Sequence, residues 1–101
     1  MIEYNTLTDA DRRIARDYEV EWAGRLSNGD LVFIKALVYH VAVYVNPDGM
    51  GGCENRYCLS NKQLAVKAIL EYEETGVMRY WQKWHNRNLS VVGTHLYGPD
   101  V

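Results

Sequence analysis

The chain has 101 residues, of which 48% are hydrophobic, and its formal net charge is −2. This length fits one domain spanning residues 1–101, and the hydrophobic fraction excludes a wholly disordered chain, which needs low hydrophobicity and high net charge. The small net charge gives no general attraction to nucleic acid or to an anionic membrane.

Nothing in the chain predicts export or membrane insertion. Residues 1–16 carry charges from Glu3 onward and have no apolar core, so they do not form a secretory leader. The longest apolar stretch, residues 31–45, is interrupted by Lys35 and His40 and is too short and too polar to span a bilayer. We therefore expect a cytoplasmic protein that makes no membrane contact.

A short helix followed by a strand is expected in the N-terminal third. Thr8 or Asp9 is a suitable N-cap, and the helix would run to about Asp17. From Tyr18 onward apolar and polar residues alternate, which is typical of a half-buried strand. The alternating apolar residues are Tyr18, Val20, Trp22 and Leu26. A continued helix remains an alternative, because some of these residues also recur every four positions. We prefer the strand, because residues 27–30 follow with an Asn-Gly pair that suits a hairpin turn.

The middle of the chain predicts further sheet. Residues 31–45 are rich in branched and aromatic side chains, and we expect one long strand with a bulge or bend near Lys35 or His40. Both of its faces are apolar, which indicates either a central strand covered on both sides or a strand at an oligomer interface. Residues 46–52 predict a loop rich in glycine, and residues 56–59 predict a short strand.

The main helix is expected at about residues 60–75. Ser60 is a suitable N-cap and forms the pattern of a capping box with Gln63. Leu59 and Leu64 occupy the positions of a hydrophobic staple, and Gly76 can adopt the left-handed conformation that ends a helix. One apolar stripe consists of Leu64, Ala65, Ala68, Ile69 and Tyr72.

The C-terminal quarter predicts a final hairpin. Residues 77–84 and 89–97 both have the composition of strands, and residues 85–88 would turn between them. Hairpins combined with one packed helix predict an α+β fold with a mainly antiparallel sheet and a short additional helix near the N-terminus.

Four side chains are of the types that bind zinc: Cys53, Cys58, His85 and His95. The cysteines are five positions apart and the histidines ten, which fits structural zinc sites poorly. We expect no metal and no other cofactor, and both cysteines should be free thiols. A cysteine–histidine catalytic pair lacks a marked third group that would orient it.

Two other patterns favour structural readings. The glycine-rich residues 48–52 could cradle an anion with backbone amides, but no Gly-Lys-Ser/Thr follows them, so a flexible connection is preferred. The acidic residues Glu71, Glu73 and Glu74 fall at the end of the main helix and predict a solvated helix end, with Arg79 nearby to answer their charge.

Aromatic and basic residues gather in residues 79–87. As a strand, this stretch would present Arg79, Trp81 and Lys83 on one face, with Arg87 beyond. Indole and positive charge together suit either base stacking with phosphate contacts or a protein-binding hot spot. The structural alternative is that a tryptophan packs under the helix and the cations are ordinary surface. We predict these four residues as the binding residues.

A resemblance adds a biological setting. The segment Glu-Asn-Arg-Tyr-Cys-Leu-Ser at residues 54–60, followed by an alanine-rich helix that ends in Glu-Thr-Gly at residues 74–76, resembles small uncharacterised proteins of bacteriophages and other mobile elements. The resemblance covers about residues 40–85. It implies an accessory protein that binds and redirects a host protein, a class that includes inhibitors of bacterial defence systems, and it carries over no catalytic residues.

Three functions follow from the sequence. The first is a non-enzymatic accessory protein that binds a host protein or a protein–nucleic acid complex and modulates it. The second is direct nucleic-acid binding through the aromatic and basic stretch Arg79–Arg87. The third is a ligand-binding module or small enzyme with a pocket between helix and sheet. A homodimer is compatible with all three, because residues 31–45 offer more apolar surface than one helix covers.

Overall fold

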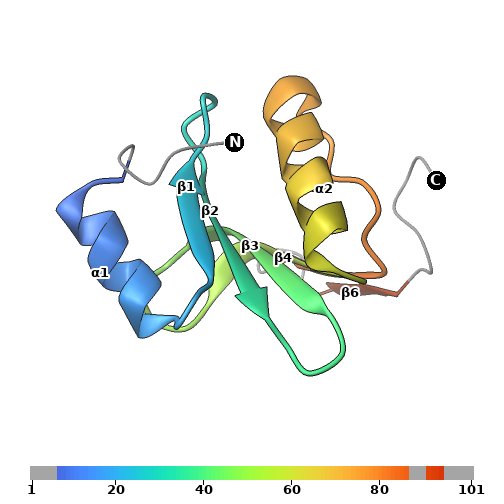
Figure 1. Ribbon diagram of the computed structural model, residues 1–101, viewed down its shortest axis with the longest axis horizontal. Coiled ribbons are helices and arrows are strands. Elements are labelled where there is room, and N and C mark those ends of the chain that lie inside the picture. The colour runs from blue at the N-terminus through green and yellow to red at the C-terminus, as the bar shows by residue number, and fades with distance from the viewer. Residues whose placement is uncertain (1–6, 87–90, 95–101) are drawn as a thin grey trace.

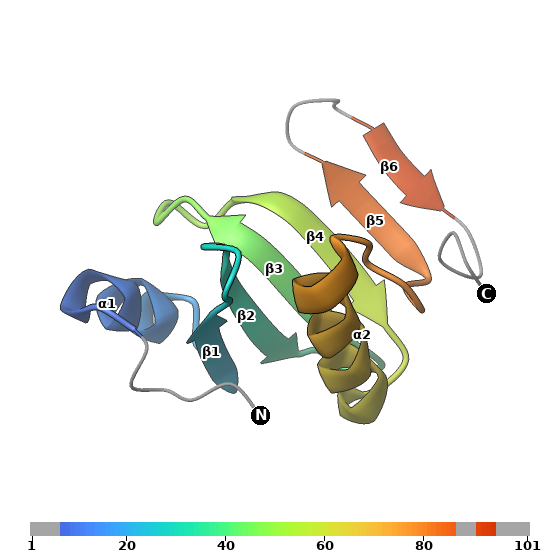
Figure 2. The same cartoon turned by 90° about the horizontal axis from the view of Figure 1, so that it is seen from above.

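The computed structural model describes residues 7–86 and 91–94, with the side chains described up to residue 86. It is an α+β fold, as predicted, in which a six-stranded antiparallel sheet follows chain order from β1 to β6 (Figures 1 and 2). The elements are α1 (Asp9–Asp17), β1 (Trp22–Arg25), β2 (Leu31–Ala36), β3 (Val41–Pro47), β4 (Cys53–Leu59), α2 (Lys62–Thr75), β5 (Lys83–Asn86) and β6 (Val91–Thr94).

The two helices lie on opposite sides of the sheet (Figure 1). Side chains alternate between the two faces of a strand, so each strand can supply both sides with apolar groups. The side under α2 holds the larger core, with Val32, Ile34 and Val43 fully buried. The side under α1 holds a smaller core around Phe33, where Tyr18 packs edge-on against its ring. The expectation of strand residues covered on both faces is therefore confirmed for β2.

The prediction of one long strand over residues 31–45 was wrong, because the chain reverses completely at residues 37–40. The Leu37 amide donates to the His40 carbonyl at 2.8 Å, and this closes a tight turn between β2 and β3. The two strands then pair from Val32 with Val45 to Ala36 with Val41. The predicted bend near His40 lies at the right place in the chain, but the chain reverses its direction there instead of bending.

The flanking strands also differ from their predicted bounds. The predicted strand over residues 18–26 is shorter, because Tyr18 ends α1 as its C-cap and Glu19 has a positive φ of 55°. The hairpin turn at residues 27–30 is confirmed by the Leu26 amide, which donates to the Asp30 carbonyl. The predicted loop over residues 46–52 is shorter too, because β3 continues to Pro47 and β4 begins at Cys53.

The main helix lies where it was predicted, but its N-cap is Asn61 rather than Ser60. The Asn61 side chain accepts a hydrogen bond from the Leu64 amide at 2.9 Å, so the capping box of Ser60 with Gln63 does not form. Gly76 ends the helix with a left-handed φ of 79°, as predicted. At the C-terminal end of α2, the Tyr72 hydroxyl donates to Asp30 at 2.6 Å and joins the helix to the β1–β2 turn.

The predicted strand over residues 77–84 was wrong for most of its length. Residues 77–82 are irregular, Tyr80 has a positive φ of 68°, and the strand begins only at Lys83. The second predicted strand, over residues 89–97, is represented by β6, which pairs with β5. Of the predicted turn at residues 85–88, His85 and Asn86 belong to β5, and the rest lies outside the described residues.

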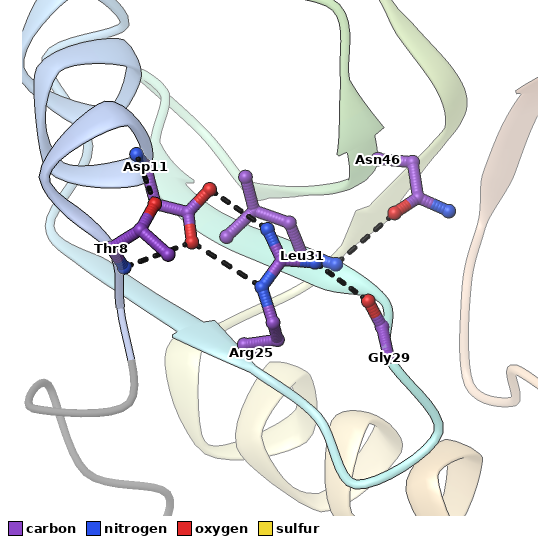
Figure 3. A network of polar contacts seen from close by, with 6 residues as sticks. All are labelled: Thr8, Asp11, Arg25, Gly29, Leu31 and Asn46. Atoms are coloured by element: carbon purple, nitrogen blue, oxygen red, sulfur yellow. Dashed lines mark hydrogen bonds and ion pairs between the residues drawn. The ribbon is translucent and has the colours of Figure 1, made fainter.

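A polar network anchors α1 and the β1–β2 turn to the sheet (Figure 3). Thr8 and Asp11 form a reciprocal capping box at the start of α1. The Asp11 carboxylate also receives Arg25 at 2.8 Å, and Arg25 donates to the Gly29 carbonyl at 2.7 Å. One buried carboxylate therefore holds the helix start to strand β1, and through Arg25 to the turn that follows it.

We expect Asp11→Ala to lower the free energy of unfolding at pH 7 by about 1–2 kcal/mol, because it removes half of the capping box and the carboxylate that pairs with Arg25. Burial alone raises the pKa of Asp11, but the hydrogen bonds and charge of Arg25 and Thr8 outweigh it, and the pKa lies below its ordinary value of 3.8. A lowered pKa gives stability that is present above the unfolded-state pKa and lost as the pH falls through the folded-state pKa.

The difference in the free energy of unfolding between wild type and Asp11→Ala should therefore be smaller at about pH 3 than at pH 7, and urea denaturation at both pH values measures it. Asp9→Ala, which changes an exposed carboxylate in the same helical turn, is the matched control and should have a smaller effect. Equal losses for the two variants would contradict the role of Asp11.

Candidate functional site

The structure separates the four residues that were predicted as binding residues. Trp81 is 8% exposed, and its indole N–H donates to the Met78 carbonyl at 3.0 Å. Arg79 forms an ion pair with Glu71 at 3.1 Å, while Lys83 is exposed at the start of β5. Arg87 lies outside the described residues. The expectation that Arg79, Trp81 and Lys83 share one exposed strand face was therefore wrong.

Trp81 is buried because the chain turns inward after α2. The positive φ of Tyr80 breaks the extended run, and the indole then packs against Tyr57 and Trp84, with ring centroids 6.1 Å from each. The Gln82 amide donates to the Cys58 carbonyl at 2.8 Å and leads the chain into β5. The alternative prediction, that a tryptophan packs under the helix, is confirmed by Trp81.

The zinc-type residues do not form a metal site within residues 7–86. Cys58 is buried and Cys53 is half-buried, and both are free thiols. His85 lies on β5 opposite Arg56, and His95 is outside the described residues. Nowhere in the described part of the chain do three or more histidine, cysteine, aspartate or glutamate side chains gather closely enough to hold a metal ion.

The glycine-rich turn at residues 48–52 is a fixed structure whose amides are already occupied. The Asp48 carboxylate accepts hydrogen bonds from the amides of Met50 and Gly52 at 2.8 and 3.1 Å. The Gly51 amide donates to the Tyr18 hydroxyl at 3.0 Å, and that hydroxyl lies 2.6 Å from the Gly52 carbonyl oxygen. An internal carboxylate and a phenol therefore take the place that a bound phosphate would have in an anion-binding loop.

The acidic end of α2 is partly solvated and partly used for tethering. Glu71 accepts hydrogen bonds from the Tyr80 hydroxyl and from Arg79, and these partners hold its pKa below the ordinary value. Glu73 accepts a hydrogen bond from the Ser27 amide at 2.7 Å. The prediction that Arg79 lies near these acidic residues is confirmed by its ion pair with Glu71. Glu74 is exposed, as expected.

The helices leave part of the sheet uncovered. Strand pairing places Phe33, Tyr44, Arg56 and His85 in one row and Lys35, Ala42, Cys58 and Lys83 in the next. Both rows lie on the side opposite α2, and the core under α1 includes Phe33 and extends to Tyr44, whose ring packs edge-on against Tyr18. We call the remaining surface the open face. It is defined by Lys35, Tyr44, Arg56, Lys83 and His85.

A pocket of about 210 Å³ opens at one edge of the open face. Tyr44, Arg56 and His85 line it together with Gly51, Gly52 and Cys53. Burial raises the pKa of the Tyr44 hydroxyl, while the charge and hydrogen bond of Arg56 oppose this shift. Arg56 thus lines a hollow together with a tyrosine and a histidine.

A second surface feature is the turn between β2 and β3, which we call the hairpin tip and define as residues 37–40. Val38 and Tyr39 are 88% and 85% exposed, and Leu37 is 41% exposed. The tip protrudes from the sheet at the end far from the glycine-rich turn (Figure 1). Sequence reasoning missed this surface, because it placed these residues inside a continuous strand.

Comparison with known proteins leaves the chain without an assigned family: no protein-family model, curated protein or solved structure matches it. Neither helix described within residues 7–86 is long and apolar enough to cross a bilayer.

We expect Trp81→Ala to lower the free energy of unfolding by about 3–5 kcal/mol, because it empties a large volume beside Tyr57 and Trp84. Lys83→Ala, two positions later and exposed, should change it by no more than about 0.5 kcal/mol. Urea denaturation followed by far-ultraviolet circular dichroism measures both. A Trp81→Ala protein as stable as the wild type would contradict the buried placement.

Proposed function

We propose that this chain is a non-enzymatic accessory protein that binds a host protein and modulates it, with the hairpin tip as its main contact. The observation that supports this most directly is the nearly complete exposure of Val38 and Tyr39 side by side at the tip. Single apolar residues on a surface are normal, but adjacent ones on a projecting turn are characteristic of an interaction site.

The hairpin tip is well suited to anchoring. Its turn is closed by a backbone hydrogen bond, and the flanking strands pair on both sides of it, so little backbone order has to be gained on binding. Tyrosine buries a large rigid ring at low entropic cost and is enriched in binding hot spots. Burial of Tyr39 and Val38 in a partner would therefore supply much of the affinity.

The chemistry of the tip favours a protein partner. Leu37, Val38 and Tyr39 carry no charge, so their contribution to binding comes from apolar burial and depends little on salt. The resemblance of residues 40–85 to small bacteriophage proteins supports a host cytoplasmic protein, such as a component of a bacterial defence system, as the partner. Nucleic-acid binding through Arg79–Arg87 has less support, because Trp81 is not available to stack on a base.

The original reason for expecting a homodimer does not hold in the structure. It depended on uncovered apolar surface in residues 31–45, yet Phe33 and Leu31 are buried under α1, and Val43 is buried under α2. Pairing through the hairpin tips would be a different arrangement, and it would occupy the surface that the partner needs.

The test is capture of host protein from a bacterial host lysate by immobilised wild type and by the double variant Val38→Ser, Tyr39→Ser. We expect the double variant to lose tenfold or more in affinity for the captured protein, because it removes both apolar anchors. Met50→Ser is the matched control, since Met50 is 87% exposed but lies on the turn at the opposite end of β3.

Loss of capture in both variants would indicate general stickiness rather than a defined contact. Full retention by the double variant would show that the hairpin tip is not the contact. Size-exclusion chromatography of the free proteins at two concentrations separates partner binding from self-association, which would shift the wild type alone.

A further inference from the structure

The open face differs in charge from the rest of the molecule. The chain as a whole has a formal net charge of −2, yet the two rows of paired residues on the open face contain three cations, Lys35, Arg56 and Lys83. Against them stands the carboxylate of Glu54, which lies two positions before Arg56 on the same face of β4. Charge segregation of this kind creates a local positive potential that net charge conceals. The surface is therefore complementary to a polyanion.

Arg56 differs from Arg25 and Arg79 in the group that it contacts. Arg25 is paired with Asp11 and Arg79 with Glu71, each in an ion pair with a carboxylate. Within the described residues, Arg56 interacts with the Tyr44 hydroxyl, a neutral group that satisfies only part of the guanidinium. Arg56 is exposed and lines the pocket together with Tyr44 and His85.

The spacing of the cations suits a chain of phosphates rather than one isolated anion. Lys83 pairs with Cys58, and Arg56 lies two positions from Cys58 on the same face of β4, so these two cations are diagonal neighbours about 7–8 Å apart at the backbone. Lys35 lies across two further strands, about 14 Å from Lys83 at the usual strand spacing. The three charges form a track across the sheet.

Two half-buried rings border this track, His85 and Tyr44, and the Tyr44 ring is already packed edge-on against Tyr18. Tyr44 and His85 lie on the strands either side of Arg56, directly opposite it in the row. Aromatic and imidazole rings beside cations on an exposed sheet face form the combination that holds single-stranded nucleic acid, by stacking on bases and contacting phosphates. The glycine-rich turn closes one end of the pocket as a rigid wall, because its own amides are occupied by Asp48 and Tyr18.

We propose that the open face binds single-stranded nucleic acid, with one phosphate held in the pocket by Arg56 and the neighbouring phosphates contacted by Lys83 and Lys35. The ring of His85 offers a base a stacking surface, with Tyr44 beside it held in place by Tyr18. This site shares no residue with the hairpin tip and does not depend on the proposed function, so the chain would carry two separate binding surfaces.

The experiment measures fluorescence anisotropy of a labelled oligodeoxythymidylate of about ten nucleotides at several salt concentrations. Three phosphate contacts on a single strand predict a slope of about −2 for log affinity against log salt concentration. Arg56→Gln should weaken binding about tenfold, and Lys83→Gln should reduce the slope to about −1.4. Circular dichroism confirms that each variant is folded.

Lys62→Gln is the matched control. It removes one positive charge, as Lys83→Gln does, but from an exposed lysine on α2, at the other side of the sheet. It should leave affinity and slope unchanged. The double variant Val38→Ser, Tyr39→Ser should also bind the oligonucleotide normally, so that failure of this proposal and failure of the host-protein proposal are distinguishable.

Three outcomes would overturn the proposal. The first is no binding of the oligonucleotide at low salt, or equal weakening by Lys62→Gln and Lys83→Gln. The second is competition by inorganic phosphate or thymidine monophosphate at the same phosphate concentration as the oligonucleotide, which would make the pocket a site for a small free anion. The third is equal competition by polyglutamate or by duplex DNA of the same length, which would indicate a general polyanion surface.

Discussion

The tight reversal at residues 37–40 is the constraint on which the rest of the structure depends. It converts one apolar stretch into two paired strands, and the resulting register sets Phe33 against Tyr44 and Lys35 against Ala42. The glycine-rich turn then pairs β3 with β4, and the segment that enters β5 pairs β5 with β4, so that Arg56 and His85 continue the row of Tyr44. A shift by one residue would move every side chain in these rows to the other face.

The two helices cover the sheet unequally, and this inequality creates the open face. The α2 helix is four turns long and packs over β2, β3 and β4, so that side is apolar from Ile34 to Leu59. The α1 helix is shorter, and the core beneath it buries Phe33 of β2 and extends to Tyr44 of β3. Beyond that core the same side carries Lys35, Arg56 and Lys83, while the small residues Ala42 and Cys58 between the lysines are buried.

The segment between α2 and β5 shows how packing competes with local pattern. By alternation alone, Arg79, Trp81 and Lys83 belong to one face of a strand. The free energy of burying an indole between Tyr57 and Trp84 favours an inward turn at Tyr80 instead. Glu71 then fixes the outer side of this turn by accepting hydrogen bonds from Tyr80 and Arg79. Of the predicted contact residues, Trp81 therefore serves the core, whereas Lys83 is exposed.

The sequence by itself determined the features that depend on neighbours along the chain: the helix near residues 60–75, its stop at Gly76, the hairpin turn at residues 27–30 and the α+β class. Each depends on capping, turn chemistry or periodicity within a few residues. Only the tertiary structure decided the reversal at residues 37–40, the burial of Trp81 and the meeting of Tyr44, Arg56 and His85. These depend on strand register and on competition for core volume, and both are settled between residues far apart in the chain.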